Sequence, residues 1–388
     1  MAAGGLGDWR YVAIALAGIS AFLNLYAPQA VLPLLAREFG VGAGETSMTM
    51  TACTLAVAIV APFSGAIADV LGRKRVIVVA MLGLTVPTAL IGFAPDLQTM
   101  IALRFVQGLL LPPIFAITIA YIGEEWPPAE ATGMTGIYFS AASCGGFLGR
   151  FLTGLMADSI GWRGAFLADA GLTLVCAAGV VLLLPRERRF IRAASLDVAL
   201  HQMLRHLRNP QLVSTYAIGF GVLFNFIAIF TFVAFLLAGP PFALSTALVG
   251  SIFVVYLFGS ALTPLTGRAV RRFGRRRLVL AMLGVWACGL GLTLLPSLPA
   301  TIAGLAICAA AGFLCQASST SYVAITAKEG PSSAVGLYVT SFYIGGSVGG
   351  VTGAMAWSLG GWPAVVAMVV AMLTVMAAIV SLAWPRVP

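Results

Sequence analysis

Three ionisable residues lie well inside apolar stretches of this sequence, namely Arg104, Arg150 and Asp169. A charged side chain is costly in hydrocarbon, so such residues usually mark an ion or proton pathway. At about 1.5 Å per residue, each lies roughly 10–12 Å from the nearer end of its stretch, and all three fall at a similar level. We therefore expect these residues to couple a charge or a proton to a conformational change.

Our working hypothesis is that Arg150 pairs with Asp169, while Arg104 faces a central cavity. Protonation of Asp169 would neutralise one partner and loosen the pair. A static pair that only specifies how helices pack is an equally good interpretation. The depth of a residue does not fix the direction in which its helix face points, so both alternatives stay open.

Polar and aromatic side chains in the same stretches are candidates for a substrate cavity, since such groups orient ligands. They are Asn24, Tyr26, Gln29, Asn225, Gln316, Tyr338 and Tyr343. For each residue alone, a hydrogen bond between helices, worth about 0.6 kcal/mol, is the simpler interpretation. The first apolar stretch contains no acid, and two intramembrane arginines accompany one aspartate. We therefore predict a neutral or anionic substrate rather than a lipophilic cation.

Residues typical of catalysis or metal binding form no recognisable constellation. Both histidines, His201 and His206, lie in one basic segment, and the six cysteines lie in apolar stretches without a C-x-x-C pair. The cysteines are therefore interpreted as packing residues. The phosphate-binding pattern G-x-x-x-x-G-K-[ST] is absent, which excludes ATP as the energy source. We expect no enzymatic activity, no metal and no cofactor, with the proton as the coupling ion.

The composition places most of the chain in a membrane. Of 388 residues, 60% are hydrophobic and 9% are charged, and the mean hydropathy is +1.01. A soluble domain is about 25% charged, so this chain cannot cover a soluble surface of its own size. The net charge of +9 is gathered in short clusters between apolar stretches. That pattern is a topology signal and argues against nucleic acid as a partner.

The elements that position these residues are predicted to be membrane-spanning helices, each needing about 20 apolar residues. A β-barrel is rejected because the apolar residues run continuously and do not alternate. Twelve stretches qualify: 11–33, 47–69, 76–94, 98–122, 132–157, 163–184, 211–237, 247–270, 278–296, 299–326, 332–358 and 362–384. The predicted fold class is therefore an all-α integral membrane protein, in which the first stretch is an uncleaved helix.

The distribution of Lys and Arg predicts the orientation in the membrane. The clusters at 73–75, 186–208 and 268–277 fall on the side that carries both termini, whereas the other side holds only Arg37 and Arg163. Basic residues accumulate on the cytoplasmic side of membrane proteins. We expect a multi-pass protein of the cytoplasmic membrane with both termini in the cytoplasm.

The sequence contains an internal repeat. The segment GIYFSAASCGGFLG begins at Gly136, and GLYVTSFYIGGSVG begins at Gly336, an offset of 200 residues. The twelve helices therefore form two six-helix pseudo-repeats of the same orientation, at 1–184 and 211–388, joined by a basic connector at 185–210. In such proteins the substrate site lies between the halves near the membrane midplane.

Two motifs carry a resemblance to the major facilitator superfamily. The loop after the second helix contains Gly65, Asp69, Gly72, Arg73, Lys74 and Arg75, which matches G-x-x-x-D-x-x-G-R-[KR]. The fourth helix contains Arg104, Gln107 and Gly108, which is similar to R-x-x-Q-G. The resemblance implies that the loop latches the cytoplasmic side in one conformation. A plain cluster that sets topology is the alternative. Glu124 and Glu125 are interpreted as a solvated helix end, with proton entry as the alternative.

Further segments resemble the proton-coupled efflux branch, near the arabinose-efflux-permease-like proteins. These are Tyr26-Ala-Pro-Gln-Ala-Val-Leu-Pro33 and the pair Gly149-Arg150. Two departures are notable. The fifth helix lacks the proline of the family's antiporter motif, and Arg271 replaces the motif aspartate in the second loop copy, which suggests an anchor to anionic lipid.

The expected function is export of a small organic molecule by a secondary active transporter, through alternating access and proton antiport. The alternatives are an importer or uniporter of the same fold, or a membrane sensor that does not transport. Partners are expected to be a small-molecule substrate and membrane lipids, and we expect the protein to act as a monomer.

Overall fold

The computed structural model describes residues 9–187, 203–327 and 331–385, with the side chains of residues 66, 69, 70, 128, 129, 331 and 332 also left out. Every regular element in these ranges is helical. The middle of the predicted connector 185–210, including His201, lies outside the described residues.

The N-terminal half contains α1 to α6. Helix α1 (Arg10–Tyr26) continues into a 3₁₀ turn, η1 (Ala27–Ala30), and is followed by the short helix α2 (Leu32–Phe39). The long helices are α3 (Ala43–Leu71), α4 (Arg73–Ile91), α5 (Leu97–Glu125) and α6 (Pro128–Leu183). Helix α5 begins after Asp96, whose side chain accepts a hydrogen bond from the amide of Thr99 at 2.7 Å. That bond holds the pKa of the Asp96 carboxyl below its ordinary value.

The C-terminal half contains α8 to α14. Helix α8 (Pro210–Ala238) is followed by a broken passage made of α9 (Thr246–Ile252), α10 (Val255–Leu262), η2 (Thr263–Leu265) and α11 (Thr266–Phe273). The long helices are then α12 (Arg275–Leu292), α13 (Leu298–Thr326) and α14 (Pro331–Ala383). The passage predicted as one helix over 247–270 is interrupted at Pro264, which lacks the N–H that a continuous α-helix needs.

The prediction of twelve membrane crossings is confirmed. Nine helical stretches in the described ranges are long and apolar enough to cross a membrane, and two of them contain two crossings each. Helix α6 breaks at Gly161, and α14 breaks at Gly360 and Gly361. Helix α12, an 18-residue helix that is not among the nine, supplies the twelfth crossing.

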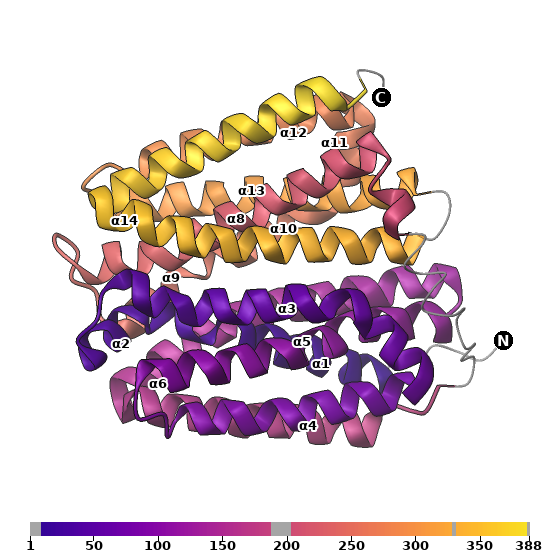
Figure 1. Ribbon diagram of the computed structural model, residues 1–388, viewed down its shortest axis with the longest axis horizontal. Helices are drawn as coiled ribbons and strands as arrows, with labels where there is room; N and C mark the ends of the chain where they lie inside the picture. Colours follow the sequence, from indigo (N-terminus) through magenta and orange to yellow (C-terminus); the bar gives the residue numbers. More distant parts are fainter. Residues whose placement is uncertain (1–8, 188–202, 328–330, 386–388) are drawn as a thin grey trace.

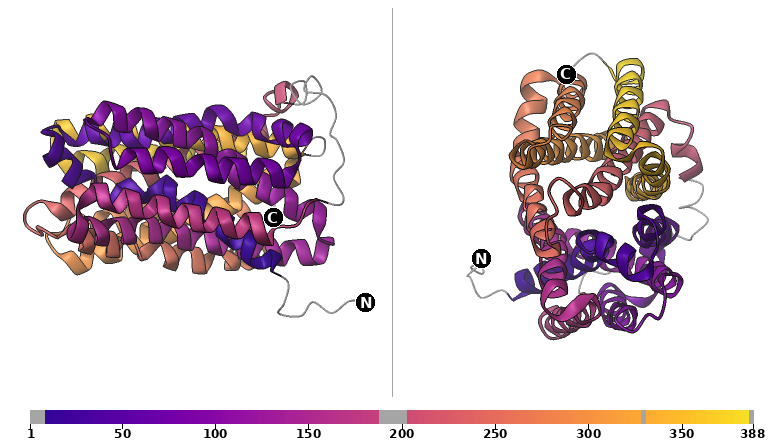
Figure 2. Two further views of the ribbon diagram at one scale, coloured as in Figure 1. Left: turned by 90° about the horizontal axis from the view of Figure 1, so that it is seen from below. Right: turned by 90° about the vertical axis from the view of Figure 1, so that its left-hand side faces the viewer.

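The two halves lie side by side with their long helices roughly parallel to the longest axis (Figure 1). Viewed along that axis, the N-terminal helices and the C-terminal helices form separate groups (Figure 2). Because the number of crossings is even, α1 begins and α14 ends at the same end of the molecule. We call this the terminal end and the opposite end, which carries α2 and α9, the far end.

The internal repeat is visible in the backbone. Gly72 between α3 and α4 has φ 89° and ψ 144°, and Gly274 between α11 and α12 has φ 78° and ψ 146°. Positive φ of this kind is strained for residues with a Cβ atom. The same turn is thus built at equivalent points of both halves, which explains the glycine in both loop copies.

The glycines of the repeat also seal equivalent helix pairs. A Cβ atom on Gly145 or Gly149 of α6 would collide with backbone atoms of α1, at Ile19 and Leu23 respectively. In the other half, Gly345 and Gly349 of α14 meet the backbone of α8 at Phe220 and Phe224 in the same way. Small residues allow helix backbones to approach this closely. We refer to these two contacts as the glycine seams.

Candidate substrate cavity

A cavity of ≈ 250 Å³ lies between the two halves. Aromatic rings form most of its wall: Phe22, Tyr26, Phe115, Tyr138 and Phe139 from the N-terminal half, and Phe226, Tyr256, Phe313, Tyr338, Phe342 and Tyr343 from the C-terminal half. The stacked rings of Phe115 and Tyr343, with centroids 5.9 Å apart, meet across the boundary. Among the described residues that line the cavity, Arg150 carries the one charged side chain.

The candidate cavity residues from the sequence divide into two groups. Tyr26, Gln316, Tyr338 and Tyr343 line the cavity. Asn24, Gln29 and Asn225 are fully or almost fully buried and are not among its lining residues. Asn225 donates to the Sδ atom of Met376 at 3.5 Å, within its own half. Gln29 lies behind the cavity wall, where it donates to the Thr231 hydroxyl of the other half at 3.2 Å.

Arg150 is the central polar residue of the cavity. Its Nε donates to Gln29 Oε1 and its Nη1 donates to the Gly146 carbonyl, both at 2.7 Å. Its guanidinium carbon lies 4.0 Å from the ring centroid of Tyr26 and 4.2 Å from that of Tyr256. The Nη2 atom is buried and has no hydrogen-bond partner. The expected ion pair of Arg150 with Asp169 is therefore wrong: the arginine points toward the cavity and the aromatic rings instead.

Asp169 is buried between the two arms of α6. Its Oδ2 accepts a hydrogen bond from the Thr153 hydroxyl at 2.6 Å, and its Oδ1 has no partner. Thr153 lies one helical turn beyond Arg150, so the carboxyl and the guanidinium occupy neighbouring levels, but each is bonded to other partners. The depth expected from the sequence is compatible with this placement, but the direction of each side chain separates the two charges.

Arg104 does not face the cavity, contrary to the expectation. It is fully buried and donates to the carbonyls of Asn24 and Leu25 at 2.7 Å each. The carbonyl of Asn24 would normally accept from the residue four positions later, which is Pro28 and has no N–H. Arg104 therefore satisfies a carbonyl that the end of α1 leaves open.

Gln107 extends this arrangement into a network, which explains the pairing of arginine and glutamine in the motif. Its Oε1 accepts from Arg104 at 2.6 Å, and its Nε2 donates to the Thr88 hydroxyl at 2.7 Å. Thr88 in turn donates to Asn24 Oδ1 at 2.7 Å. The network joins α1, α4 and α5, so its role is to fix the N-terminal half rather than to contact a substrate.

The cavity is closed at the far end by α6 and α9. An added Cβ on Gly154 would lie 2.7 Å from the Thr246 carbonyl oxygen, and one on Gly250 would lie 2.7 Å from that of Arg150. The amide of Ala247 donates to Asp158 Oδ2 at 2.9 Å. At Gly154 and Gly250 the backbones of the two halves therefore touch directly, and the Asp158 side chain adds one hydrogen bond beside them.

A second contact between the halves joins α3 to α14. The hydroxyls of Thr54 and Ser347 are 2.9 Å apart and share a hydrogen bond. One turn farther toward the far end, Gly350 leaves room for Thr51. The cavity walls extend from the level of these contacts toward the terminal end, where Ile119, Thr320 and Val335 contribute to the lining.

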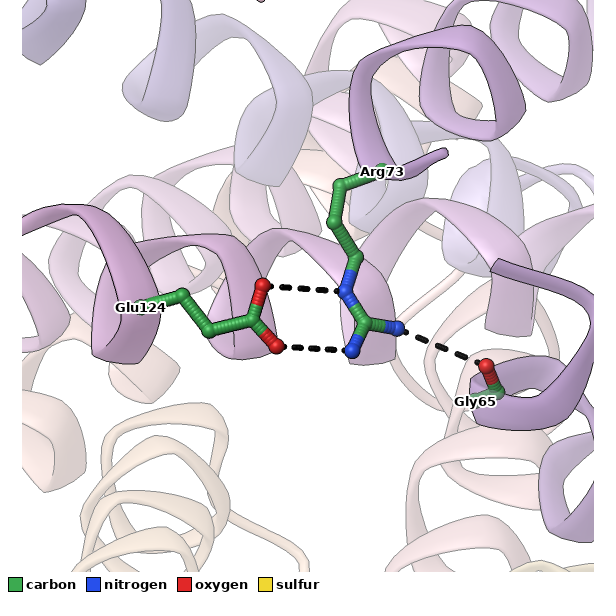
Figure 3. A network of polar contacts seen from close by, with 3 residues as sticks. All are labelled: Gly65, Arg73 and Glu124. Carbon is green, nitrogen blue, oxygen red and sulfur yellow. Dashed lines mark hydrogen bonds and ion pairs between the residues drawn. The ribbon is translucent and has the colours of Figure 1, made fainter. Parts of the chain in front are cut away.

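The loop motif at the terminal end ties the N-terminal half together. Arg73 donates from Nη2 to Glu124 Oε1 at 2.7 Å and from Nε to Oε2 at 3.2 Å, and its Nη1 donates to the Gly65 carbonyl at 3.4 Å (Figure 3). Glu124 is thus an ion-pair partner and not the solvated helix end that was expected. Lys74 donates from Nζ to the Val181 carbonyl of α6 at 3.0 Å.

Other members of the motif contribute differently. Gly72 supplies the turn, and Arg75 is exposed. The side chain of Asp69 lies outside the described residues, so its predicted role stays a prediction. In the second copy, Arg275 takes the place of Arg73 and donates to Ser321 Oγ at 2.6 Å and to the Ser318 carbonyl. A hydroxyl and a carbonyl thus replace the carboxylate of Glu124.

The sequence profile of the Major Facilitator Superfamily matches residues 14–250 and 218–388, which together span nearly the whole chain. The chain belongs to the Major Facilitator Superfamily. It is therefore a multi-pass membrane transporter for a small molecule, and not an enzyme.

Individual relatives of this superfamily member agree with that assignment. The inner membrane transport protein YnfM of Escherichia coli (strain K12) is 31% identical over 360 residues, covering 92% of this chain and 86% of the relative. The puromycin resistance protein pur8 of Streptomyces alboniger is 30% identical over a shorter region, 49% of this chain and 38% of the relative. The fold is similar to that of an inward-facing, unoccupied bacterial homologue of the human lysosomal transporter Spinster, with a TM-score of 0.79 at 16% identity and coverage of 99% and 100%.

Several residues that surround Arg150 and Asp169 in this superfamily member were not identified from the sequence. Phe253 and Tyr256 of the broken α9–α10 passage surround Arg150, and Thr153 binds Asp169. The signal for Thr153 was its position one turn after an intramembrane arginine. The aromatic residues gave no such signal, because the chain has 23 phenylalanines and 9 tyrosines, and ten of the twelve apolar stretches contain at least one of them.

Proposed function

We propose that this protein exports a small organic molecule across the cytoplasmic membrane by alternating access, in exchange for protons. The observation that carries the proposal is the cavity between the halves, which is closed at the far end by the contact of α6 with α9. The distribution of Lys and Arg supports placing the terminal end in the cytoplasm, and we adopt that orientation in the proposal. The cavity then lies on the cytoplasmic side of its closure, where an exporter collects its substrate.

The contacts at the two ends fit a rocking motion of the halves. Backbone contacts without interlocking side chains, as at Gly154 and Gly250, separate as a unit when the halves rotate. The bonds of Arg73, by contrast, lie within the N-terminal half and hold its helices together while it moves. Contacts between the halves would exchange, whereas contacts within each half would persist.

Asp169 is the proposed proton carrier. Of the 13 acidic residues, it lies deepest inside a membrane-spanning stretch, and it is the carboxyl that a proton can neutralise at the level of the cavity. The Thr153 hydroxyl donates to its Oδ2, and its Oδ1 has no hydrogen-bond partner among the described residues. Asp169 forms no ion pair with Arg150, so protonation cannot act by loosening such a pair. We propose instead that loss of the Asp169 proton changes the packing of the two arms of α6.

The direction and the substrate class rest on two further observations. The pur8 relative is named for resistance to puromycin, and resistance by a transporter is most simply explained by export. Arg150, without a carboxylate among the described lining residues, favours a neutral or anionic substrate over a cation. Import or uniport by the same fold remains the second candidate, since the cavity would serve either direction.

The same structure supports proposals about the oligomeric state and about contact with lipids. The cavity lies between two halves of the same chain, so we propose that a monomer is sufficient. The arginines of α11 and the start of α12 include the exposed Arg271, Arg272 and Arg277. We propose that this cluster contacts anionic headgroups at the cytoplasmic surface, each residue contributing about 1 kcal/mol.

Transport into inside-out proteoliposomes tests the proposal. Purified protein would be reconstituted, and accumulation of a radiolabelled substrate from a ligand panel would be measured with an acidic lumen, without a gradient, and with the gradient reversed. Export by proton antiport predicts accumulation only with the acidic lumen. Equal rates in all three conditions would indicate a uniporter, accumulation with the reversed gradient a proton symporter, and no flux of any ligand a protein that does not transport.

A further inference from the structure

We propose that the substrate is a small aromatic carboxylate whose carboxyl group binds Nη2 of Arg150. This inference rests on the proposed transport function and specifies its substrate class. It joins three observations: an unpartnered guanidinium nitrogen, the lack of a compensating charge, and an aromatic wall.

The hydrogen bonds of Arg150 leave one nitrogen of the guanidinium without an acceptor. Nε and Nη1 are engaged by Gln29 and by the Gly146 carbonyl, whereas Nη2 has no partner although the residue is fully buried. A buried donor without an acceptor is destabilising, and more so when it is charged. Because Arg150 also lines the cavity, an acceptor supplied by a ligand would remove this cost.

Among the residues that the structure describes, none supplies an anion for this cation. Asp169 is bonded to Thr153, and the described lining of the cavity contains no carboxylate. The faces of Tyr26, Phe253 and Tyr256 lie 4.0, 4.8 and 4.2 Å from the guanidinium carbon. Aromatic faces stabilise a cation electrostatically without neutralising it. The site therefore holds a positive charge in place and leaves its neutralisation to the ligand.

The remainder of the cavity selects the body of the ligand. Phe22, Phe115, Phe342 and Tyr343 present flat apolar surfaces, and such rings pack favourably on another aromatic group. The volume of ≈ 250 Å³ is below the range of about 300–1,000 Å³ for drug-sized ligands. A carboxylate attached to one or two fused rings fits both the chemistry and the size.

The test compares matched ligands on the purified protein in detergent, by isothermal titration. The panel is benzoate, 2-naphthoate and octanoate, each beside its uncharged amide, with 2-naphthylmethylamine as the cation. At least one aromatic acid is expected to bind about tenfold to hundredfold more tightly than its amide. Octanoate is expected to bind more weakly than 2-naphthoate, and the amine most weakly. If every acid binds no better than its amide in the unaltered protein, the inference is overturned.

Variants locate the site. Arg150→Gln is expected to reduce the ratio of acid to amide affinity to about one while the amide still binds, and the exposed Arg163→Gln is expected to leave the ratio unchanged. An Arg150→Gln protein that keeps the full preference would place the carboxylate elsewhere and refute the assignment. If that variant does not fold, the comparison of acid and amide on the unaltered chain still decides. No proton gradient is involved, so failure of this inference leaves proton-coupled export untouched, and failure of export leaves these affinities interpretable.

Discussion

Arg150 of α6 and Tyr256 of α10 join the two halves of the molecule, with 4.2 Å between the guanidinium carbon and the ring centroid. Arg150 also contacts Tyr26 of its own half at 4.0 Å. The guanidinium therefore lies between two rings. Tyr26 belongs to the same half and would move with Arg150 when the halves rotate, whereas Tyr256 belongs to the other half and would move away from it. Opening of the far end in the proposed cycle must separate Arg150 from Tyr256.

Loss of the Tyr256 ring is expected to favour the state that is open at the far end. Tyr256→Leu removes a cation–π contact worth about 1 kcal/mol, or about fivefold in the ratio of the two states. Spin labels at Ile160 and Leu295, exposed residues of opposite halves, would report this ratio by pulsed electron resonance, with Cys144 and Cys288 replaced by serine. Tyr256→Phe retains the ring and should resemble the unaltered protein. Identical distance distributions for the Leu and Phe variants would exclude a role of the ring in closure.

A methyl group at Gly250 is expected to prevent closure of the far end. Its Cβ would lie 2.7 Å from the Arg150 carbonyl oxygen, a backbone atom that cannot swing aside. Gly250→Ala should therefore lower the transport rate at least about tenfold, since about 1.4 kcal/mol against the closed state suffices. Gly171→Ala is the matched control, because open space surrounds that position. Normal transport by Gly250→Ala would show that this contact is not part of the cycle.

The ion pair of Arg73 and Glu124 is expected to stabilise the folded N-terminal half. Glu124→Gln weakens two hydrogen bonds to a largely buried guanidinium, so the free energy of unfolding should fall by about 1–3 kcal/mol. The lower apparent melting temperature would be read in detergent. Glu38→Gln is the control, because its pair with Arg163 is exposed on both sides and contributes about 0–1 kcal/mol. Equal shifts for both variants would argue against a special role of the motif pair.

Asp169→Asn is expected to uncouple transport from protons. Asparagine has the same shape, and its Oδ1 still accepts from Thr153, so folding should be preserved. Accumulation driven by a pH gradient should be lost, whereas exchange of labelled for unlabelled substrate without a gradient should continue. The same assays on Glu38→Gln, far from the cavity, should give the unaltered result. Undiminished gradient-driven transport by Asp169→Asn would assign proton coupling to another group.

The fold was predictable because its signals are long and repeated. Twelve apolar stretches and a repeat at an offset of 200 residues predicted the helices and the two halves. The glycines of the repeat also marked the close helix contacts, since Gly145 and Gly345 meet neighbouring backbones at equivalent positions. Such features depend only on composition and spacing, which a sequence displays directly.

The site was only partly predictable, because the depth of a residue in the membrane does not determine the direction in which its side chain points. The rise per residue placed Arg104, Arg150 and Asp169 at similar levels, but the rotation of each helix depends on packing. Arg104 turns toward the carbonyl that Pro28 leaves open, and Arg150 toward three rings of which two come from the other half. Contacts with segments far away in the sequence decide both directions, and no spacing rule within one helix contains them.

The glycine seams have a practical consequence for following this protein at work. Since α1 is joined to α6 and α8 to α14 through direct backbone contact, each pair has little room to slide without a clash. Two probes inside one half, such as Phe93 and Ile160, should thus report a constant separation throughout turnover. Their distance is an internal reference for calibrating a second probe pair that spans both halves. The distance of that second pair is then sufficient to follow the whole cycle.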